Sequence, residues 1–381
     1  MLSQSLYTNK KHSLFLSMDY LRFFPLNRTN RGYDNLPKSF SLGGRQYAYI
    51  SSQNVKSNKR AELGHCYDVD KNELKEKIKN YKFGDPNISY TLDVASVLEL
   101  CECKSISGKN KKKGTDSNED TENKKSTKNK KKGTDSDEDI ENKKVTDSDE
   151  NKKKGSNVPL LISLAELHYL YESKELKKGL LNFDIDFFGR MYADNKDFDV
   201  RGVAQIAPIS SIFPTEITDD LVACRNSLKD KRGCIGLQEQ GLVSFVGYGH
   251  DNFNISELLE RGYTKEQVVE VSVLYVLRTF RLMFTSGVTG TAHNTLPYYF
   301  HITLSYGMPV NHLEKFQLSG EYFFTEEESI KILKDSIDIN NKWCKCMNKS
   351  DHIPSDIKSF PFTPLDIDTL ENSLKEVLDG I

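Results

Sequence analysis

The amino-acid sequence predicts an α+β fold in which a sheet packs against a layer of helices. Alternating apolar residues predict strands near both ends of the chain, and a long apolar run behind a capping motif predicts a helix between them. These elements follow one another without the regular period of a repeat protein. A sheet with helices on one side is the simplest arrangement that buries one face of each element.

The first predicted strand lies near the N-terminus. Apolar side chains occupy every second position from Leu14 to Tyr20, and Ser17 and Asp19 fall on the opposite side. A period of two is typical of a strand with one face in the core and the other toward solvent. We therefore predict a half-buried strand here.

A change of composition then interrupts the chain. Between residues 104 and 157 apolar residues almost vanish, and NKKKGTDSNED at Asn110 returns as NKKKGTDSDED at Asn129. Such a segment cannot bury enough apolar surface to offset the entropy lost on folding, and its acidic residues largely cancel its lysines. We predict a disordered insertion over residues 104–157, in preference to an RNA-binding arm. It separates two parts of one core, residues 1–103 and 158–320, and a helical extension follows at residues 321–381.

The second part of the core begins with a helical pattern and ends with a strand. Thr264 with Gln267 forms a capping box, which marks the start of the longest predicted helix. Apolar patterns predict these elements in order: a helix over Leu160–Leu181, a strand over Phe183–Phe187, a strand over Leu242–Tyr248, a helix from Thr264 to about Phe284, and a strand over Tyr298–Leu304.

Bulk composition narrows the class of protein. The 381 residues are 37% hydrophobic, which is enough for a sizeable core, and the formal net charge is −2. RNA affinity would therefore have to come from local clusters of Lys and Arg. An odd number of cysteines, seven, and the absence of a signal-peptide pattern predict a cytoplasmic protein, and no apolar run reaches the length of a membrane span.

The segment from Asn27 to Arg60 concentrates basic and turn-forming residues. Its first part is a polar loop that ends at Lys38 and suits contact with phosphates. A Gly43–Gly44 pair follows, where a ligand could approach the backbone closely. After Arg45 comes the alternation of a strand, in which exposed tyrosines could stack on bases.

The third part of this segment is a predicted helix. Ser51 and Ser52 are candidate N-caps, and Lys56, Lys59 and Arg60 recur at a spacing of three to four residues on one face. A helix N-terminus with free amides beside a basic stripe can bind an anion. An ordinary surface hairpin and solvated helix explain the same pattern, so the residues alone leave both interpretations open.

The order of these motifs resembles a known family. NRG, a later Lys, GG, a basic residue, Tyr-Ile-Ser-Ser-Gln and a basic helix resemble the N-terminal signature of the backbone subunit (Cas-seven, DevR-like) of type I CRISPR Cascade complexes. The resemblance spans Leu14 to about Leu318. It continues in FDIDFFGRM at Phe183, VAQIAPISSIFP at Val203 and GCIGLQEQGLVSFVGYGHDNFNI at Gly233.

This resemblance implies a ferredoxin-like (RNA-recognition-motif-like) core with helical elaborations and a thumb hairpin, of I-B or I-E kind. It implies a non-enzymatic subunit without a cofactor. The implied partners are guide crRNA, target DNA, further copies of the chain, and the Cas-five, Cas-six, large and small subunits. The implied RNA-binding residues are Asn27, Arg28, Arg31, Lys38, Gly43, Gly44, Arg45, Ser52, Gln53, Lys56, Lys59 and Arg60, and the implied thumb residues are Thr218, Asp219, Gly233, Ile235 and Gly236.

Other interpretations remain open at the level of sequence. Asp34 in the basic loop suggests a metal-dependent ribonuclease like the type III backbone subunits, and a stand-alone RNA-binding regulator is a third possibility. Asp184 and Asp186 either hold Mg²⁺ or form the polar face of a strand, the latter being the simpler explanation. The C-x-C pairs at Cys101 and Cys344 lack zinc-site spacing and are interpreted as free thiols.

Overall fold

A computed structural model of the protein describes residues 13–66, 69–82, 88–103, 159–174, 180–191, 199–225, 234–284, 294–307, 309–350, 354 and 357–380. The strands are β1 (Leu14–Asn27), β2 (Ser39–Leu42), β3 (Arg45–Ile50), β4 (Ser89–Asp93), β5 (Pro159–Ser163), β6 (Ala204–Ile206), β7 (Ile209–Ser211), β8 (Thr218–Arg225), β9 (Cys234–Asn254), β10 (Pro297–Tyr306) and β11 (Lys358–Pro361).

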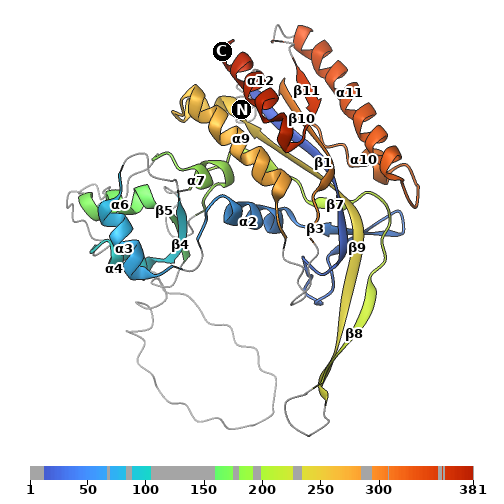
Figure 1. Cartoon of the computed structure of the whole chain (residues 1–381), viewed down its shortest axis with the longest axis horizontal. Coiled ribbons are helices and arrows are strands. Elements are labelled where there is room, and N and C mark those ends of the chain that lie inside the picture. Colours follow the sequence, from blue (N-terminus) through green and yellow to red (C-terminus); the bar gives the residue numbers. More distant parts are fainter. Residues whose placement is uncertain are drawn as a thin grey trace, which may run out of the picture.

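Helices are distributed along the whole described chain (Figure 1). Among the described residues, no helix combines the length and apolar composition needed to cross a membrane. The helices are α2 (Ser52–Glu62), α3 (Lys71–Asn80), α4 (Val94–Leu100), α6 (Leu164–Ser173), α7 (Phe183–Phe188), α8 (Ile255–Glu260), α9 (Lys265–Arg281), α10 (Glu314–Gln317), α11 (Glu326–Ser350), the 3₁₀ helix η2 (Pro364–Asp366) and α12 (Ile367–Asp379).

One antiparallel sheet organises the main body of the molecule. Its strands follow the order β11–β10–β1–β9–β7–β3–β2, and β6 and β8 also pair with β9. Strand β1 lies inside the sheet, with Leu16 opposite Leu304 of β10 on one side and Phe253 of β9 on the other. The prediction of a mixed fold built on a sheet and helices is confirmed.

Both faces of the sheet are covered, which differs from the predicted two-layer arrangement. Leu16 and Met18 of β1 enter a core completed by α8, α9 and α12. Leu21 lies in a second core with residues of α10 and α11, such as Phe316 and Leu333. Asp19, predicted to face solvent, is consequently 2% exposed. Alternation along β1 correctly predicted a strand, but helices contributed by the end of the chain cover its polar face.

Most predicted elements of the second half are present. The capping box of Thr264 and Gln267 opens α9, and the predicted strands at 242–248 and 298–304 are parts of β9 and β10. The segment predicted as one helix over Leu160–Leu181 instead begins with strand β5. Ser163 then caps α6 through a capping box with Glu166, so the helix starts four residues later than expected.

The strand predicted over Phe183–Phe187 is wrong, because these residues form helix α7. Asn182 accepts a hydrogen bond from the Ile185 amide and caps the helix, and all six residues of α7 are buried. Asp184 and Asp186 therefore alternate with apolar residues without facing solvent. Their carboxylates bind other residues of the protein, so the polar and the apolar side chains of α7 are both buried. The prediction of a strand depended on a contrast between a buried apolar face and an exposed polar face, and α7 has no such contrast.

A smaller lobe lies beside the main sheet (Figure 1). Strands β4 and β5 pair antiparallel, and α3, α4 and α6 pack around them on a separate apolar core that includes Leu74, Leu100 and Leu167. The predicted insertion at 104–157 lies between α4 and β5 and outside the described residues. The two flanks of that segment thus belong to one packed unit.

The C-terminal part of the chain is built into the main core. Strand β11 pairs with β10 at the edge of the sheet, and Phe362 and Leu370 enter the same core as β1. Helix α12 packs on α9 across this core. The region predicted as a helical extension thus also contributes a strand.

Candidate nucleic-acid interface

The loop that follows β1 is closed by its own hydrogen bonds. The Gly32 amide donates to the Leu36 carbonyl at 2.8 Å, and the Lys38 amide donates to the Asn30 carbonyl at 2.8 Å. Asn35 adopts the left-handed conformation with φ 64°, which asparagine tolerates better than most residues. Several bonds therefore fix the shape of the polar loop between Asn27 and Lys38.

Asn27 and Arg28 anchor this loop to β9. Asn27 Nδ2 donates to the Val243 carbonyl at 3.1 Å, and Arg28 donates to Gln240 Oε1 at 2.9 Å. Both side chains are buried, with exposed fractions of 2% and 4%. The structure therefore places these two predicted RNA contacts beneath the surface, where they position the loop against the point at which β8 and β9 leave the sheet.

Arg31, Tyr33 and Lys38 are the side chains that this loop presents outward. Arg31 is exposed and donates to Asn35 Oδ1 at 2.9 Å, and Lys38 is half-buried. Tyr33, which sequence reasoning did not single out, is fully exposed. Asp34 accepts a hydrogen bond from the Leu36 amide at 3.1 Å, so its carboxylate supports the turn. Two cations and an aromatic ring thus share one ordered loop.

The hairpin of β2 and β3 places Arg45 beside its turn, opposite Leu42. Gly43 and Gly44 have φ of 59° and 76°, the conformation required by a two-residue turn, and no atom would contact a Cβ at either position. The guanidinium of Arg45 lies 4.2 Å from the ring centroid of Tyr322 and donates to the Gly320 carbonyl. The glycine pair is therefore needed for the turn, and a distant loop orients Arg45.

The predicted exposure of the β3 tyrosines is only partly correct. Tyr47 is 2% exposed and its ring stacks on Phe40 with centroids 5.6 Å apart. Tyr49 is half-buried, with its ring at an angle to that of Phe40. Tyr47 is not available for stacking on a base, because β2 covers it.

The N-terminus of α2 meets the loop through Asn30. Ser51 is the N-cap, as predicted, and its hydroxyl accepts from the Asn54 amide at 3.4 Å. Asn30 Oδ1 accepts from the Ser51 amide at 2.9 Å, so one asparagine joins the loop to the start of the helix. Ser52 is half-buried and Gln53 is exposed in the first turn, where amide groups lack partners within the helix.

The basic residues of α2 point into the protein. Lys59 is 1% exposed and forms an ion pair with Asp251 of β9. It also donates to Thr279 Oγ1 at 2.8 Å and lies 4.7 Å from the ring centroid of Tyr275. Burial lowers the pKa of Lys59, an effect that the Asp251 carboxylate opposes. Lys59 is therefore a core residue, and the predicted solvent-facing stripe is wrong at this position.

Arg60 and Lys56 contact α7 and its C-cap. Arg60 Nε lies 2.9 Å from Asp184 Oδ1, and the guanidinium also binds the Gly189 carbonyl. Lys56 Nζ donates to the Phe188 carbonyl at 3.1 Å, and burial together with the charge of Arg60 lowers its pKa. Sequence reasoning missed these contacts because the partners of α2 follow more than 120 residues later in the chain.

The two aspartates of α7 each bind a cation of the protein. Besides Arg60, Asp184 accepts from His65 Nδ1 at 3.0 Å and from Ser89. Asp186 binds Arg261 at 2.9 Å and accepts from the Tyr263 hydroxyl at 2.8 Å. Within the described ranges, no group of three or more His, Cys, Asp or Glu side chains is arranged to hold a metal ion.

The cysteines of the first C-x-C pair lie in the smaller lobe. Cys101 is buried and its thiol donates to the Leu167 carbonyl at 3.4 Å; burial raises its pKa to about 12. Cys103 is half-buried and donates to the Cys101 carbonyl at 3.2 Å. Such thiols remain protonated and are poor nucleophiles at neutral pH.

A long hairpin of β8 and β9 extends away from the sheet (Figure 1). Thr218 and Asp219 of β8 pair with Leu242 and Gly241 of β9 at its base. A Cβ at Gly241 would lie 2.7 Å from Leu36 Cδ2, so the polar loop packs closely on β9 at this position. Ile235 and Gly236 belong to the β9 backbone, and Gly233 lies outside the described residues.

Together these elements form one continuous surface, here called the loop–hairpin surface. The polar loop packs on the hairpin base through Arg28 and Leu36 and on α2 through Asn30. Its outward side chains come from three elements: Arg31, Tyr33 and Lys38 from the polar loop, Arg45 from β3 and Gln53 from α2. The positive charges of Arg31, Lys38 and Arg45 and the backbone amides in the first turn of α2 suit contact with a phosphate backbone.

Comparisons with known proteins agree on the kind of fold. Residues 16–342 match the model of a family described as "CT1975-like protein". A solved chain described as "CRISPR RNA-guided surveillance complex, pre-nicking" has a TM-score of 0.61 at 15% identity, covering 94% of this chain and 100% of that chain. Another, described as "CRISPR RNA-guided surveillance complex", has a TM-score of 0.52 at 12% identity, with 94% and 99% covered. Among curated proteins, no significant relative was found.

Proposed function

Because the chain belongs to the CT1975-like protein family, we propose that it is a guide-RNA-binding backbone subunit of a CRISPR surveillance complex. The similarity of its fold to chains of RNA-guided surveillance complexes over almost their whole length carries this proposal. In it, the protein contacts the RNA backbone and leaves sequence recognition to base pairing with target DNA. Several copies share one guide RNA, beside the other subunits of a type I complex.

The proposed RNA path follows the loop–hairpin surface. Arg31, Lys38 and Arg45 supply positive charge, and the first turn of α2 supplies amide donors. Tyr33 is an exposed aromatic ring within the same loop and can stack on a base. Lys59 is not part of this path, because its charge is bound to Asp251 inside the core.

We also propose a ferredoxin-like centre for the sheet. The neighbouring strands β10–β1–β9–β7 are all antiparallel, α2 follows β1 in the chain, and α9 connects β9 to β10. Domains of this topology often bind RNA on an open sheet face. Here α10 and α11 cover that face with Phe316, Leu333 and Ile337, which supports RNA binding at the loops instead.

The proposal predicts a non-specific, salt-dependent RNA affinity that Arg31→Ala with Lys38→Ala weakens. Each lost phosphate contact should lower the slope of log affinity against log salt by about 0.7 for single-stranded RNA. Fluorescence anisotropy with labelled repeat-spacer RNA, at several salt concentrations, measures both effects. Lys71→Ala, an exposed lysine of the smaller lobe, is the control and should change neither. An unaltered slope in the double variant would exclude this surface.

The same protein and RNA also distinguish an RNA-binding subunit from a nuclease. We propose that the protein has no nuclease activity, so complementary RNA should stay intact with Mg²⁺ present, and Asp34→Ala should behave as the wild type. Cleavage at regular intervals that Asp34→Ala abolishes would instead establish the ribonuclease alternative. Asp34 is exposed and its carboxylate accepts the Leu36 amide, so the substitution affects only the local turn.

A further inference from the structure

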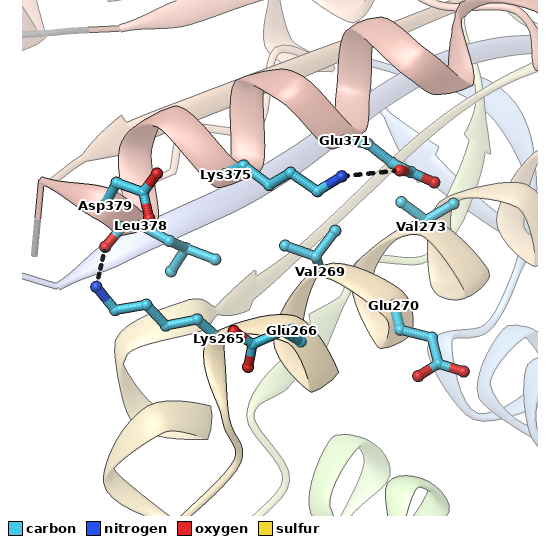
Figure 2. Close-up of a pocket in the computed structure, with 9 residues that line it drawn as sticks. All are labelled: Lys265, Glu266, Val269, Glu270, Val273, Glu371, Lys375, Leu378 and Asp379. Atoms are coloured by element: carbon cyan, nitrogen blue, oxygen red, sulfur yellow. Dashed lines mark hydrogen bonds and ion pairs between the residues drawn. The ribbon is translucent and has the colours of Figure 1, made fainter.

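A groove lies between α9 and α12, on the face of the sheet opposite α11. It encloses about 520 Å³. Figure 2 shows Val269, Val273 and Leu378 between the two helices, where they form an apolar floor. A concave apolar floor of this size can take one or two large side chains of a ligand or of another part of the chain.

Charges at the rim of the groove are mostly negative. The acidic residues that surround it are Glu266, Glu270, Glu371 and Asp379. Both lysines of the rim are engaged: Lys265 Nζ donates to a backbone carbonyl of α12 at 2.7 Å, and Lys375 Nζ lies 3.3 Å from Glu371 Oε2 (Figure 2). In the described part of the chain, Glu270 and Asp379 have no ion-pair partner.

This charge pattern selects the class of occupant. A nucleic acid would bring phosphates next to uncompensated carboxylates, which repel them. Residues 104–157 do not fit either, because they almost lack the apolar side chains that the floor requires. A polypeptide segment with apolar side chains and an excess of lysines complements both the floor and the rim.

The first twelve residues of the chain have this composition. They read MLSQSLYTNKKH and precede Ser13, at which the described structure begins. Large apolar side chains come first and two lysines follow: Leu2, Leu6, Tyr7, Lys10 and Lys11. No Asp or Glu occurs among these twelve residues, here called the N-terminal segment. Its charge is therefore opposite to that of the groove.

The N-terminal segment joins the described structure close to one end of the groove. The Leu14 amide donates to Ser256 Oγ of α8 at 2.9 Å, and α8 leads directly into the start of α9. The C-terminal half of α12 lies at the same end of the sheet, because Lys358 of β11 binds Glu376 at 2.9 Å. Lys358 pairs with Leu304 of β10, close to the partner of Leu14 on that strand.

The length and the order of the N-terminal segment also fit the groove. Twelve extended residues span about 40 Å, whereas the part of α9 from Lys265 to Val273 is about 12 Å long. The lysines are nearest to Ser13 and therefore reach the rim at Asp379 first. The apolar residues, farther from Ser13, reach the floor beyond it.

We propose that the N-terminal segment binds in the groove between α9 and α12 of the same molecule, with Leu6 and Tyr7 on the apolar floor and the two lysines beside the acidic rim. The segment is tethered to β1, so it acts at a high effective concentration, and a contact that would be weak between separate molecules becomes populated. The bound segment fastens the C-terminal helix to α9. The proposal is independent of RNA binding, because the loop–hairpin surface begins at the other end of β1.

Proteolysis of the full-length protein tests the contact. Chymotrypsin cleaves after Tyr7, and mass spectrometry follows the release of residues 1–7. The groove variant, Glu270→Lys with Asp379→Lys, should be cleaved about tenfold faster than the wild type, because like charges then meet and the segment is more often unbound. Glu327→Lys with Asp335→Lys, at two exposed acids of α11, is the matched control and should be cleaved at the wild-type rate.

Charge reversal of the segment completes this test. Lys10→Glu with Lys11→Glu should also accelerate cleavage after Tyr7 about tenfold. A chain carrying this pair together with the groove variant should return to the wild-type rate, because opposite charges then meet again. Equal rates in the wild type and the groove variant, or no recovery in the fourfold variant, would overturn the proposal.

A peptide of residues 1–12 tests whether the segment is the occupant. Leu2→Ser with Leu6→Ser in the full-length protein removes the apolar side chains that fill the floor. The fluorescein-labelled wild-type peptide should bind this variant, and it should bind the wild-type protein at least tenfold more weakly, since the tethered segment competes with it. Equal affinity for both proteins would contradict the proposal. Failure to bind the variant would assign the groove to another molecule.

Cross-linking decides whether the contact is made within one molecule. A full-length protein with photoreactive p-benzoylphenylalanine in place of Tyr7 should cross-link to peptides of α9 and α12. In an equal mixture of ¹⁵N-labelled and unlabelled protein, both halves of each cross-linked pair should carry the same label. Pairs of mixed label would show that the segment binds a second copy, and cross-links to other elements would show that it binds elsewhere; either result overturns the proposal.

Discussion

Single residues decide which basic side chains can reach a ligand. Lys59 and Arg31 look alike in the sequence, yet Lys59 is 1% exposed and bound to Asp251, whereas Arg31 is exposed on a closed loop. The three-to-four spacing on α2 defined one helical face correctly. It could not show that this face points inward, because the balancing carboxylates of Asp184 and Asp251 are remote in sequence.

Lys59→Met should destabilise the fold by about 3–5 kcal/mol, because it leaves the Asp251 carboxylate buried without its partner. Urea unfolding followed by circular dichroism measures this loss. Lys56→Met, which removes a half-buried lysine bound to a carbonyl, is the control and should cost much less. Wild-type stability with weakened RNA binding in Lys59→Met would instead return Lys59 to the RNA path.

A buried acid–base pair predicts a pH dependence of stability. His250 Nδ1 lies 2.8 Å from Asp19 Oδ1. Burial acts to lower the pKa of His250, but the Asp19 carboxylate outweighs it and the net pKa is raised above 6.5. Burial acts to raise the pKa of Asp19, but the charge of His250 and hydrogen bonds lower it below 3.8.

The sign of the histidine effect follows from its raised pKa. Its stabilisation is complete below about pH 6.5 and is lost as the pH rises through the higher folded-state value. The urea midpoint of the wild type should therefore fall more steeply above pH 6.5 than that of His250→Asn. If the urea midpoints of the two proteins changed in parallel with pH, the pair of His250 and Asp19 would not titrate in this range.

Elements with a local signal were predicted best. The capping box at Thr264, the alternation along β1 and the apolar run of β10 each lie within a few neighbouring residues, and each element is present. Helix α7 was mistaken for a strand because it is buried all round, which removes the periodic contrast. The local sequence around β1 also could not predict that the second face of the sheet is covered, because this depends on where α11 packs.

The cap of α9 gives a prediction at the scale of this element. Thr264 Oγ1 accepts from the Gln267 amide at 3.2 Å, and Gln267 Oε1 accepts from the Thr264 amide at 2.9 Å. Thr264→Ala should cost about 1 kcal/mol of unfolding free energy, because the first turn loses an acceptor. Thr264→Ser keeps the hydroxyl and should therefore retain most of the unfolding free energy that Thr264→Ala loses. Equal urea midpoints for all three proteins would contradict this account.

At the scale of the whole molecule, two packed bodies are connected by the polypeptide on either side of the smaller lobe. Within that lobe, Cys103 contacts the Leu170 carbonyl at 3.6 Å and Lys174 Nζ donates to the Cys101 carbonyl at 2.9 Å. Both contacts join the residues that follow α4 to the C-terminal end of α6. The sequence predicted a boundary at 104–157 from composition alone, without information on how its two flanks pack.

Replacing residues 104–157 with a short glycine–serine linker should leave the thermal unfolding midpoint unchanged. The lobe is held by the pairing of β4 with β5 and by its own apolar core, and both lie in the retained residues. Differential scanning calorimetry measures the midpoint and the enthalpy. Disappearance of a cooperative transition would mean that the removed segment contributes to the core.

Strand β9 runs without interruption from the projecting hairpin into the centre of the sheet. It spans 21 residues, and Asp251, which binds Lys59, lies near its inner end. The eight residues from Cys234 to Gly241 reach about 25 Å beyond the sheet at the usual strand rise. The backbone of a core strand therefore sets the distance between the sheet and any molecule that contacts the end of this hairpin. A change in the number of residues in this part of β9 would change that distance by about 3.3 Å per residue.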